Sequence, residues 1–384
     1  MNKLFIFILL FFVLTAKAQL SNIEVDNRML KIPNSQTKSI ATIANYIKEN
    51  FVSDSNKIRA IFFFTANHIE YDVDNMFAIN FNETTENKIE KGLKSKIGVC
   101  MHYAEVFNAL AKELKFESYV VEGMTKQNGN TDGMAHSWNA TKIEGKWYLF
   151  DVTWGSGNVN QGRFIKKLDN QYYKVKPSKL ESTHYPFDYL WQFSANPIRA
   201  NDFLHSRPSS NKTKIDYEKL LKELPRLSEL EKVNAALQRI EANGLSHSII
   251  FDRYIYLKQI VTIIPYNEAV ADYNEAVKKF NIYINFRNKQ FSPAKTDEEL
   301  KKMILSPKQL LELASIKLLS IKYVDKKLGI NPESLLESIA ELEKNIQEQS
   351  KFVNEYINTK PEKRKQLFYT KEITLFGIPT KKNK

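Results

Sequence analysis

The only cysteine of the chain, Cys100, is followed by a histidine and an aspartate, each in a motif with aromatic residues. Cys100 lies in Gly-Val-Cys-Met-His-Tyr, His136 in His-Ser-Trp-Asn and Asp151 in Asp-Val-Thr-Trp. A thiol beside an imidazole is an activated nucleophile, and a carboxylate on the far side of the imidazole fixes the tautomer of the ring. These residue types in this order therefore predict a cysteine nucleophile, its general base and the group that orients the base.

Strand geometry gives an independent reason to expect His136 and Asp151 to meet. Two predicted strands flank Glu144-Gly145, a dipeptide suited to a two-residue hairpin turn. With that turn, Ile143 lies opposite Lys146 in the hairpin. Counting along both strands then brings His136 and Asp151 to diagonal positions on one face of the sheet, within reach of each other's side chains. The alternative is a structural strand histidine and a capping carboxylate.

Cys100 begins a predicted helix, and the spacing of its apolar residues gives that helix one buried stripe, formed by Tyr103, Phe107, Leu110 and Leu114. The unpaired N–H groups and the dipole at a helix start favour a thiolate over a thiol. The backbone N–H of Cys100 is also a candidate donor to an oxyanion. No side chain stands out as a second donor. Gly98 allows a tight turn before the helix.

As a set, these motifs resemble those of the transglutaminase-like cysteine hydrolase superfamily, and most closely the branch that includes the kyphoscoliosis peptidase. The resemblance spans about residues 37–205 and includes a later stretch, Ser182-Thr-His-Tyr-Pro, that is similar to the same branch. It implies an α+β fold with a papain- or transglutaminase-like core, in which a central helix carries the cysteine against an antiparallel sheet. It also implies that Cys100, His136 and Asp151 are the catalytic residues and that the reaction passes through a thioester.

Three more side chains are candidate walls of a substrate cleft. Trp138 and Trp154 flank the predicted site, although a core position suits them equally. His102 stands where the family often has a small residue, and it is expected at the floor of the cleft. His184 is expected to make a structural hydrogen bond. Because the sequence has no Cys/His cluster, phosphate-binding loop or dinucleotide motif, we expect no cofactor and no metal.

The remaining pattern predicts a catalytic domain followed by helices. Helices are expected at 39–50, after Asp54 as N-cap and from Cys100, with an irregular segment at 74–96. Further helix starts are indicated by Thr296-Asp-Glu-Glu, Ser306-Pro307 and Asn331-Pro332. The expected organisation is a signal peptide at 1–18, a transglutaminase-like domain at 19–206, a linker at 207–214, and a helical bundle with a basic tail at 215–384.

Residues 1–18 have the features of a signal peptide. Lys3 precedes an apolar run of 11 residues, Leu4–Leu14, and Ala16-Lys-Ala18 matches a cleavage site. The run is too short to span a bilayer as a helix, and the alternative is a retained anchor. We therefore predict a mature chain that begins at Gln19 and is secreted or periplasmic. A single cysteine permits no internal disulfide, so the core alone must hold the fold.

The net charge of +12 lies mainly in the C-terminal part, where residues 212–384 hold 31 Lys/Arg against 23 Asp/Glu. Such a surface is either a solvated helical face or a contact for an acidic surface or protein partner. No nucleic-acid module is recognisable. We expect an exported peptidase or amidase that acts on a protein, a peptide or a cell-wall peptide. The alternatives are a non-catalytic binding or scaffold protein with the same fold, and an enzyme that transfers the acyl group to an amine.

Overall fold

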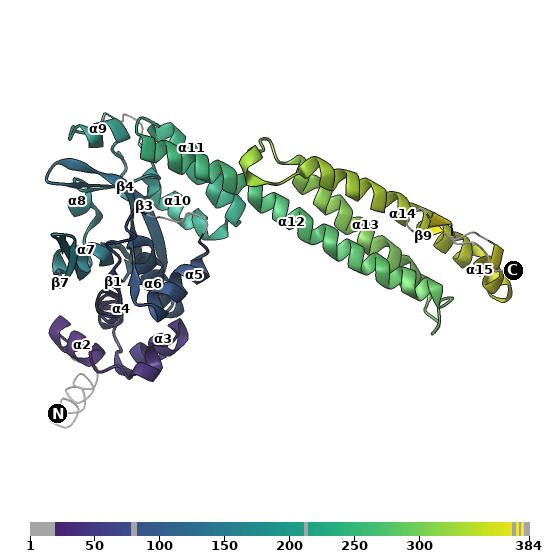
Figure 1. The fold of residues 1–384 in the computed structure, drawn as a ribbon, viewed down its shortest axis with the longest axis horizontal. Coiled ribbons are helices and arrows are strands. Elements are labelled where there is room, and N and C mark those ends of the chain that lie inside the picture. Colours follow the sequence, from purple (N-terminus) through teal and green to yellow (C-terminus); the bar gives the residue numbers. More distant parts are fainter. Residues whose placement is uncertain (1–19, 78–82, 211–213, 371–373, 376–377, 380–384) are drawn as a thin grey trace, which may run out of the picture. The chain divides into compact units, whose positions relative to one another are not determined.

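The computed structural model describes residues 20–77, 83–210, 214–370, 374–375 and 378–379 (Figure 1). The predicted signal peptide lies outside the described residues. Two compact units divide the chain: the first contains the residues up to Arg226 together with 236–254, and the second contains 227–235 and the residues from Ile255 onward. The expected linker, 207–214, falls within the first unit, and the chain that follows it as far as Arg226 packs with that unit.

The first unit combines helices with a small antiparallel sheet. Its helices are α2 (Asn22–Met29), α3 (Ile40–Asn50), α4 (Asp54–His68), α5 (Thr85–Lys94), α6 (Cys100–Glu113), α7 (Val152–Ser156), α8 (Pro177–Leu180), α9 (Ala200–Leu204) and α10 (Tyr217–Glu223), with short 3-10 turns at Asn34–Thr37, Asn170–Tyr172, Tyr189–Gln192 and Leu224–Arg226. Its strands are β1 (Glu70–Tyr71), β2 (Ile97–Gly98), β3 (Ser118–Gln127), β4 (Asn130–Ile143), β5 (Lys146–Phe150), β6 (Gly157–Asn160), β7 (Arg163–Lys166) and β8 (His184–Pro186).

The central helix α6 packs against a four-stranded sheet in the order β5-β4-β3-β8, in which all pairs are antiparallel (Figure 1). Asn139 on β4 fixes the helix to the sheet, because its buried side-chain amide donates a hydrogen bond to the Ala104 carbonyl at 2.9 Å. Ala104 is one helical turn after Cys100. The predicted α+β fold, with the cysteine on a central helix against an antiparallel sheet, is confirmed.

Two hydrophobic clusters hold this arrangement. The larger cluster lies among α2, α3, α4 and α6, and its fully buried members include Ile61, Phe62 and Phe107. A smaller cluster is built on the sheet from Val121, Trp138, Ala140, Leu149 and Leu180. Burying apolar side chains such as these stabilises the fold by about 1.5–3 kcal/mol for each large residue. The sheet is therefore held on both sides of the strands that carry His136 and Asp151.

The predicted hairpin is confirmed in its turn and its register. Glu144 and Gly145 both have positive φ, at 50° and 80°, as a two-residue turn of this kind requires. Ile143 pairs with Lys146, and the ladder continues to the pair of Asn139 and Phe150.

Two local predictions were wrong. The segment predicted to be irregular contains α5, which Thr84 caps by accepting a hydrogen bond from the Asn87 N–H and which buries Leu93. Helix α4 is capped by Ser53 rather than Asp54, because the Ser53 hydroxyl accepts from the Asn56 N–H. In both cases a hydroxyl side chain just before the helix satisfies an otherwise unpaired N–H group.

The second unit is helical. It contains most of α12 (Ser248–Asn288), with α13 (Asp297–Leu319), α14 (Pro332–Asn358) and α15 (Leu367–Thr370), part of α11 (Glu229–Asn243), turns at Lys326–Leu328 and Pro361–Gln366, and short strands β9 (Thr374–Leu375) and β10 (Ile378–Pro379). The capped starts at Thr296 and Asn331 are confirmed. The start at Ser306-Pro307 was wrong: α13 runs through Pro307, which is buried between Ile304 and Leu311 on the core face.

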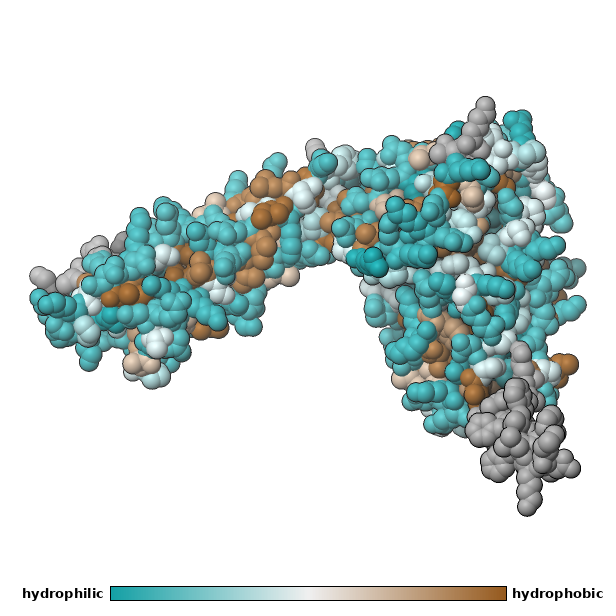
Figure 2. Space-filling view, turned by 180° about the vertical axis from the view of Figure 1, so that it is seen from behind, coloured by the Kyte–Doolittle hydropathy of each residue, from teal (hydrophilic) through white to brown (hydrophobic). Residues whose placement is uncertain are grey.

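The surface of this helical unit is mainly hydrophilic, with apolar patches (Figure 2). Its exposed large hydrophobic residues include four on α13, namely Leu305, Leu313, Ile316 and Leu319. Within the described residues, no helix has the length and apolar character needed to cross a membrane.

Gly123 on β3 offers a test of the packing beneath the sheet edge. A Cβ atom there would lie 2.1 Å from the Tyr185 carbonyl oxygen on β8 and 2.6 Å from the Trp138 ring. We expect Gly123→Ala to lower the free energy of unfolding by about 1–3 kcal/mol, measured by urea denaturation, because β8 must move away. Gly133→Ala is the control, since nothing lies within 4 Å of its Cβ position. Equal stability of the two variants would contradict this packing.

Candidate active site

Cys100 is the first residue of α6 and lies at the wall of a large cavity. Strands β1 and β2 pair in parallel just before the helix, with Tyr71 opposite Gly98. The Cys100 side chain is almost buried, at 7% exposed, and it lines a cavity of about 1040 Å³. The thiol therefore lies at the N-terminus of α6, and a small part of a substrate can reach it through the cavity.

His102 has a different place from the one predicted. It is 2% exposed, and the residues that line the cavity do not include it. Its Nδ1 accepts a hydrogen bond from the Val99 N–H at 2.9 Å, and its Nε2 lies 3.4 Å from the Glu83 carboxylate. Gly98 makes room for the ring, since a Cβ there would lie 2.7 Å from the His102 Cβ. His102 thus caps the helix that carries Cys100 and does not line the cleft.

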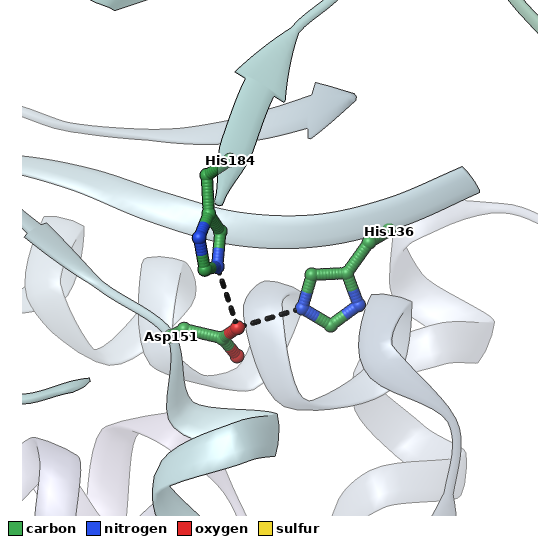
Figure 3. A group of neighbouring side chains, drawn as sticks. All are labelled: His136, Asp151 and His184. Atoms are coloured by element: carbon green, nitrogen blue, oxygen red, sulfur yellow. Dashed lines mark hydrogen bonds and ion pairs between the residues drawn. The ribbon is translucent and has the colours of Figure 1, made fainter. Parts of the chain in front are cut away.

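The structure brings His136 and Asp151 together, as the hairpin register predicts. His136 Nε2 lies 2.7 Å from Asp151 Oδ2 (Figure 3). The β4–β5 ladder ends at the pair of Asn139 and Phe150, while β4 extends beyond it to His136, which pairs with Gly123 on β3. Asp151 leaves the sheet and becomes the N-cap of α7, so it turns its carboxylate toward the His136 ring.

Every oxygen of the Asp151 carboxylate is engaged. Oδ1 accepts a hydrogen bond from the Trp154 N–H at 3.0 Å, which is the N-cap bond of α7. Oδ2 accepts from His136 and also from His184 Nε2, at 3.0 Å (Figure 3). The side chain is fully buried. The capping role considered as an alternative and the role of histidine partner therefore occur in the same residue.

Charge and burial set the protonation states of Asp151 and His136. Burial disfavours the charged carboxylate, but attraction and hydrogen bonds from His136 and His184 outweigh it and hold the pKa of Asp151 well below its usual range. Burial also disfavours a charged His136 ring. The charge and hydrogen bond of Asp151, together with a contribution from Cys100, nevertheless raise the pKa of His136 to about 10. The pair is therefore an imidazolium and a carboxylate at neutral pH.

Cys100 also raises the pKa of His136, and both residues line the same cavity, so the thiol lies near the imidazole. An ionised carboxylate only accepts hydrogen bonds, so the Nε2 atom that faces Asp151 carries a proton. The nitrogen left for the thiol is Nδ1. Cys100, His136 and Asp151 are thus arranged in sequence across the site, with the sulfur at the cavity wall.

His184 was assigned a structural hydrogen bond in the sequence, and it makes that bond to Asp151. Burial lowers the pKa of the His184 ring, and the hydrogen bond and charge of Asp151 only partly oppose this effect. His184 is therefore neutral at pH 7. The stretch Ser-Thr-His-Tyr-Pro was the only signal in the sequence, because nothing in the spacing indicates that β8 lies beside β3.

The two predicted cleft tryptophans lie in different surroundings. Trp154 lines the cavity, with its ring 5.4 Å from that of His136 and 4.9 Å from that of His184, between centroids. Trp138 is 1% exposed and belongs to the cluster on the sheet, so the prediction that it lines the cleft with Trp154 was wrong. Its ring packs edge-on against the His184 ring, with 5.1 Å between centroids.

Tyr71 is a cavity residue that the sequence did not single out. It lines the cavity with Cys100 and pairs with Gly98 through β1. Burial, together with the charges of Cys100 and Asp151, raises the pKa of Tyr71, so its hydroxyl stays a hydrogen-bond donor at any physiological pH. Other walls of the cavity come from the β3–β4 hairpin around Asp132 and from Phe164 on β7.

His136, Asp151 and His184 together hold ligand atoms of the kinds that bind a metal, all within 4.8 Å of one another. Both Nε2 atoms, however, lie within 2.7 and 3.0 Å of the same oxygen. Ligands of a tetrahedral zinc lie about 3.3 Å apart, given bonds of about 2.0–2.1 Å. The separations here are those of hydrogen bonds to a carboxylate, so the geometry does not fit a metal at this place.

Comparisons with known proteins agree with the motifs. Residues 27–152 match the family described as the transglutaminase-like superfamily. The kyphoscoliosis peptidase of Mus musculus is 30% identical over 162 residues, which are 40% of this chain and 24% of that protein. The Homo sapiens protein is 28% identical over 159 residues, or 39% and 24%. The chain thus spans about a quarter of the length of these relatives. The resemblance to this superfamily and branch is confirmed.

Two solved structures were also similar to part of the chain. One is described as a candidate cysteine protease from Cytophaga hutchinsonii, with 18% identity over 42% of this chain and 51% of the other, and a TM-score of 0.26. The other is described as a TGase, with 18% identity over 41% and 40% of the two chains and a TM-score of 0.25.

Proposed function

We propose that this protein is a cysteine-dependent hydrolase of amide bonds, a peptidase or an amidase, because residues 27–152 match the transglutaminase-like superfamily. The observation that carries the proposal is the buried, hydrogen-bonded pair of His136 and Asp151, with His136 and Cys100 lining the same cavity. An intact set of nucleophile, base and orienting carboxylate favours turnover over a purely structural use of the fold.

The chemistry proceeds in two halves. The Cys100 thiolate attacks the carbonyl carbon, a C–S bond forms, and the carbonyl oxygen takes the electron pair. When the C–N bond breaks, the His136 imidazolium gives its proton to the departing amine, and a thioester remains. In the second half His136, now neutral, takes a proton from water, and the resulting hydroxide displaces the thiolate to release the acid. Asp151 holds the His136 proton on Nε2 throughout.

The oxyanion needs donors near the sulfur. The N–H groups of the first turn of α6 have no partner within the helix, so the Cys100 N–H is available. The Tyr71 hydroxyl lines the same cavity and stays protonated. We assign these two groups to the oxyanion.

Removing the Tyr71 hydroxyl tests that assignment. We expect Tyr71→Phe to lower kcat by about 10²-fold, because one donor to the transition state is lost while the ring still packs. The rate of p-nitrophenyl acetate turnover gives kcat. The matched control is Tyr119→Phe, whose residue is not among those that line the cavity, and this variant should keep the wild-type rate. A wild-type rate in Tyr71→Phe would remove Tyr71 from the mechanism.

The proposed function is tested with a generic ester and a protein substrate. The protein should release one equivalent of p-nitrophenolate from p-nitrophenyl acetate in a burst, with an acetyl group on Cys100 detected by mass spectrometry. Fluorescein-labelled casein should then be cleaved. Incorporation of dansylcadaverine into casein without cleavage would replace the hydrolase by an amine transferase. No burst and no cleavage would favour a binding protein.

The place of action belongs to the same proposal. Export to the periplasm or the exterior, with a protein or peptide substrate there, rests on the sequence of residues 1–18, which has a basic start, an apolar run and a cleavage motif.

A further inference from the structure

The mechanism above does not use His184, a buried titratable group that contacts Asp151. His184, the first residue of β8, is 4% exposed, and its Nε2 lies 3.0 Å from the same Asp151 oxygen that His136 contacts. Figure 3 shows the two rings approaching that oxygen from different elements. A buried polar group of this kind needs a complete set of hydrogen bonds, so its second nitrogen decides what it does.

Hydrogen-bond balance fixes the state of His184. Because the Asp151 carboxylate only accepts hydrogen bonds, His184 Nε2 carries a proton. In the neutral ring Nδ1 is then a hydrogen-bond acceptor. The Thr183 hydroxyl lies 2.9 Å from Nδ1 and also 3.2 Å from the Leu180 carbonyl oxygen. Its single proton can serve only one of them. While His184 is neutral, the hydroxyl donates to Nδ1. If the ring takes a second proton, the hydroxyl can donate to the Leu180 carbonyl oxygen and accept a hydrogen bond from Nδ1–H.

The fold leaves this ring one orientation. Strand β8 pairs with β3, with His184 opposite Thr125. The Trp138 ring meets His184 edge-on at 5.1 Å, and the Trp154 ring lies 4.9 Å away, both between centroids. Tyr172 lies 6.5 Å away. Aromatic side chains thus enclose the imidazole, and its polar contacts are the Asp151 carboxylate and the Thr183 hydroxyl.

We propose that His184 is a positioning residue for the Cys100–His136 pair, in which its Nε2–H keeps the Asp151 carboxylate aimed at His136 and the Thr183 hydroxyl holds the other nitrogen of the His184 ring. This proposal rests on the proposed function of the site. It explains why a fully buried carboxylate has two imidazole partners on one oxygen: His184 supplies the donor that water would supply in an open site.

The arrangement makes the site sensitive to acid. The charged or titratable groups that act on His184 are Asp151, His136 and, more weakly, Asp132. Burial lowers the pKa of His184, so the ring is neutral at pH 7 and takes a second proton only as the pH falls. Two cationic rings would then share one carboxylate. The imidazolium form of His136 would lose part of its stabilisation, and with it the reactive form of Cys100.

The test uses the single cysteine, because every alkylation event reports on Cys100. The rate of reaction with iodoacetamide is measured against pH in the full mature chain and three variants. His184→Gln keeps an N–H donor for Asp151 but cannot be protonated in this range. His184→Leu removes the donor. Thr183→Val removes the hydrogen-bond partner of Nδ1 and nearly keeps the shape of the side chain.

We expect His184→Leu to lower the alkylation rate at pH 7 by about tenfold, because the Asp151 carboxylate loses the donor that aims it at His136. His184→Gln should retain most of the rate and lose the decline in acid. Thr183→Val should move that decline to lower pH, because a protonated Nδ1 would then be buried without an acceptor. Thermal melting identifies any variant that does not fold, and His184→Gln and Thr183→Val still decide the outcome if His184→Leu is unfolded.

A wild-type pH profile in His184→Gln and in Thr183→Val would overturn the proposal and leave His184 a packing residue. The alkylation readout needs no substrate. A protein whose alkylation responds to these variants but which releases no p-nitrophenolate has the positioning device without the proposed hydrolysis. Turnover that is unaffected by all three variants overturns the positioning role alone.

Discussion

The Cys100→Ala protein should lose amide and ester hydrolysis by about 10⁵–10⁶-fold, since removing the nucleophile of such a triad leaves only binding and oxyanion stabilisation. No second thiol can replace it, because the chain has one cysteine. The burst of p-nitrophenolate and the acetyl adduct should both be absent. The measurement is single-turnover release of p-nitrophenolate, with casein cleavage as the second readout.

The fold should tolerate this change. Cys100 is a small side chain at the cavity wall, and the first turn of α6 is fixed by the His102–Val99 bond rather than by the sulfur. We expect a shift of no more than about 1 kcal/mol in the free energy of unfolding. A Cys100→Ala protein that folds and still turns over substrate would remove Cys100 from the chemistry and, with it, the proposed mechanism.

The second large effect is expected in Asp151→Asn, with a fall in kcat of about 10³–10⁴-fold. An amide in place of the carboxylate keeps an oxygen for the Trp154 N–H, and asparagine is a good N-cap, so α7 should form. The amide nitrogen then faces the two imidazoles as a donor. His136 Nε2 must accept from it, its proton moves to Nδ1, and the ring can no longer take the proton of Cys100.

The pH dependence checks the same argument. In the wild type the pKa of His136 is raised from its ordinary 6.5 to about 10. The charged ring therefore stabilises the fold fully below pH 6.5, and this contribution is lost as the pH rises to about 10. Without the carboxylate, burial is the main effect that remains, and it lowers the pKa of the ring. Imidazole proton signals in NMR spectra should accordingly titrate at lower pH in Asp151→Asn. A titration that stays near 10 would contradict the assignment.

Several features of the site were predictable because they depend on neighbours in the sequence. The turn at Glu144-Gly145 sets the register of its own hairpin, and the register brings His136 to Asp151. The apolar spacing after Cys100 predicts the helix and its buried face, including Phe107. The caps at Thr296 and Asn331 need only residues three or four positions away.

Other features were not predictable because distant segments decide them. Trp138 lies in the cluster on the sheet because β8 and the turns beyond it cover that face. His102 is a cap because Gly98 leaves space for its ring, and a histidine beside a helix start looks the same in sequence whether it faces the cavity or the backbone. Helix α13 does not begin at Pro307 but runs through it, because Ile304 before the proline and Leu311 after it pack into the same core.

The sequence by itself singled out Cys100, His136 and Asp151 as the candidate site, because their order, their motifs and one two-residue turn constrain them locally. Only the tertiary structure decided how the carboxylate is held. Strand β8 returns to pair with β3 from far along the chain and places His184 on the oxygen that His136 uses. Such a contact depends on sheet order and side-chain packing, which spacing along the chain does not encode.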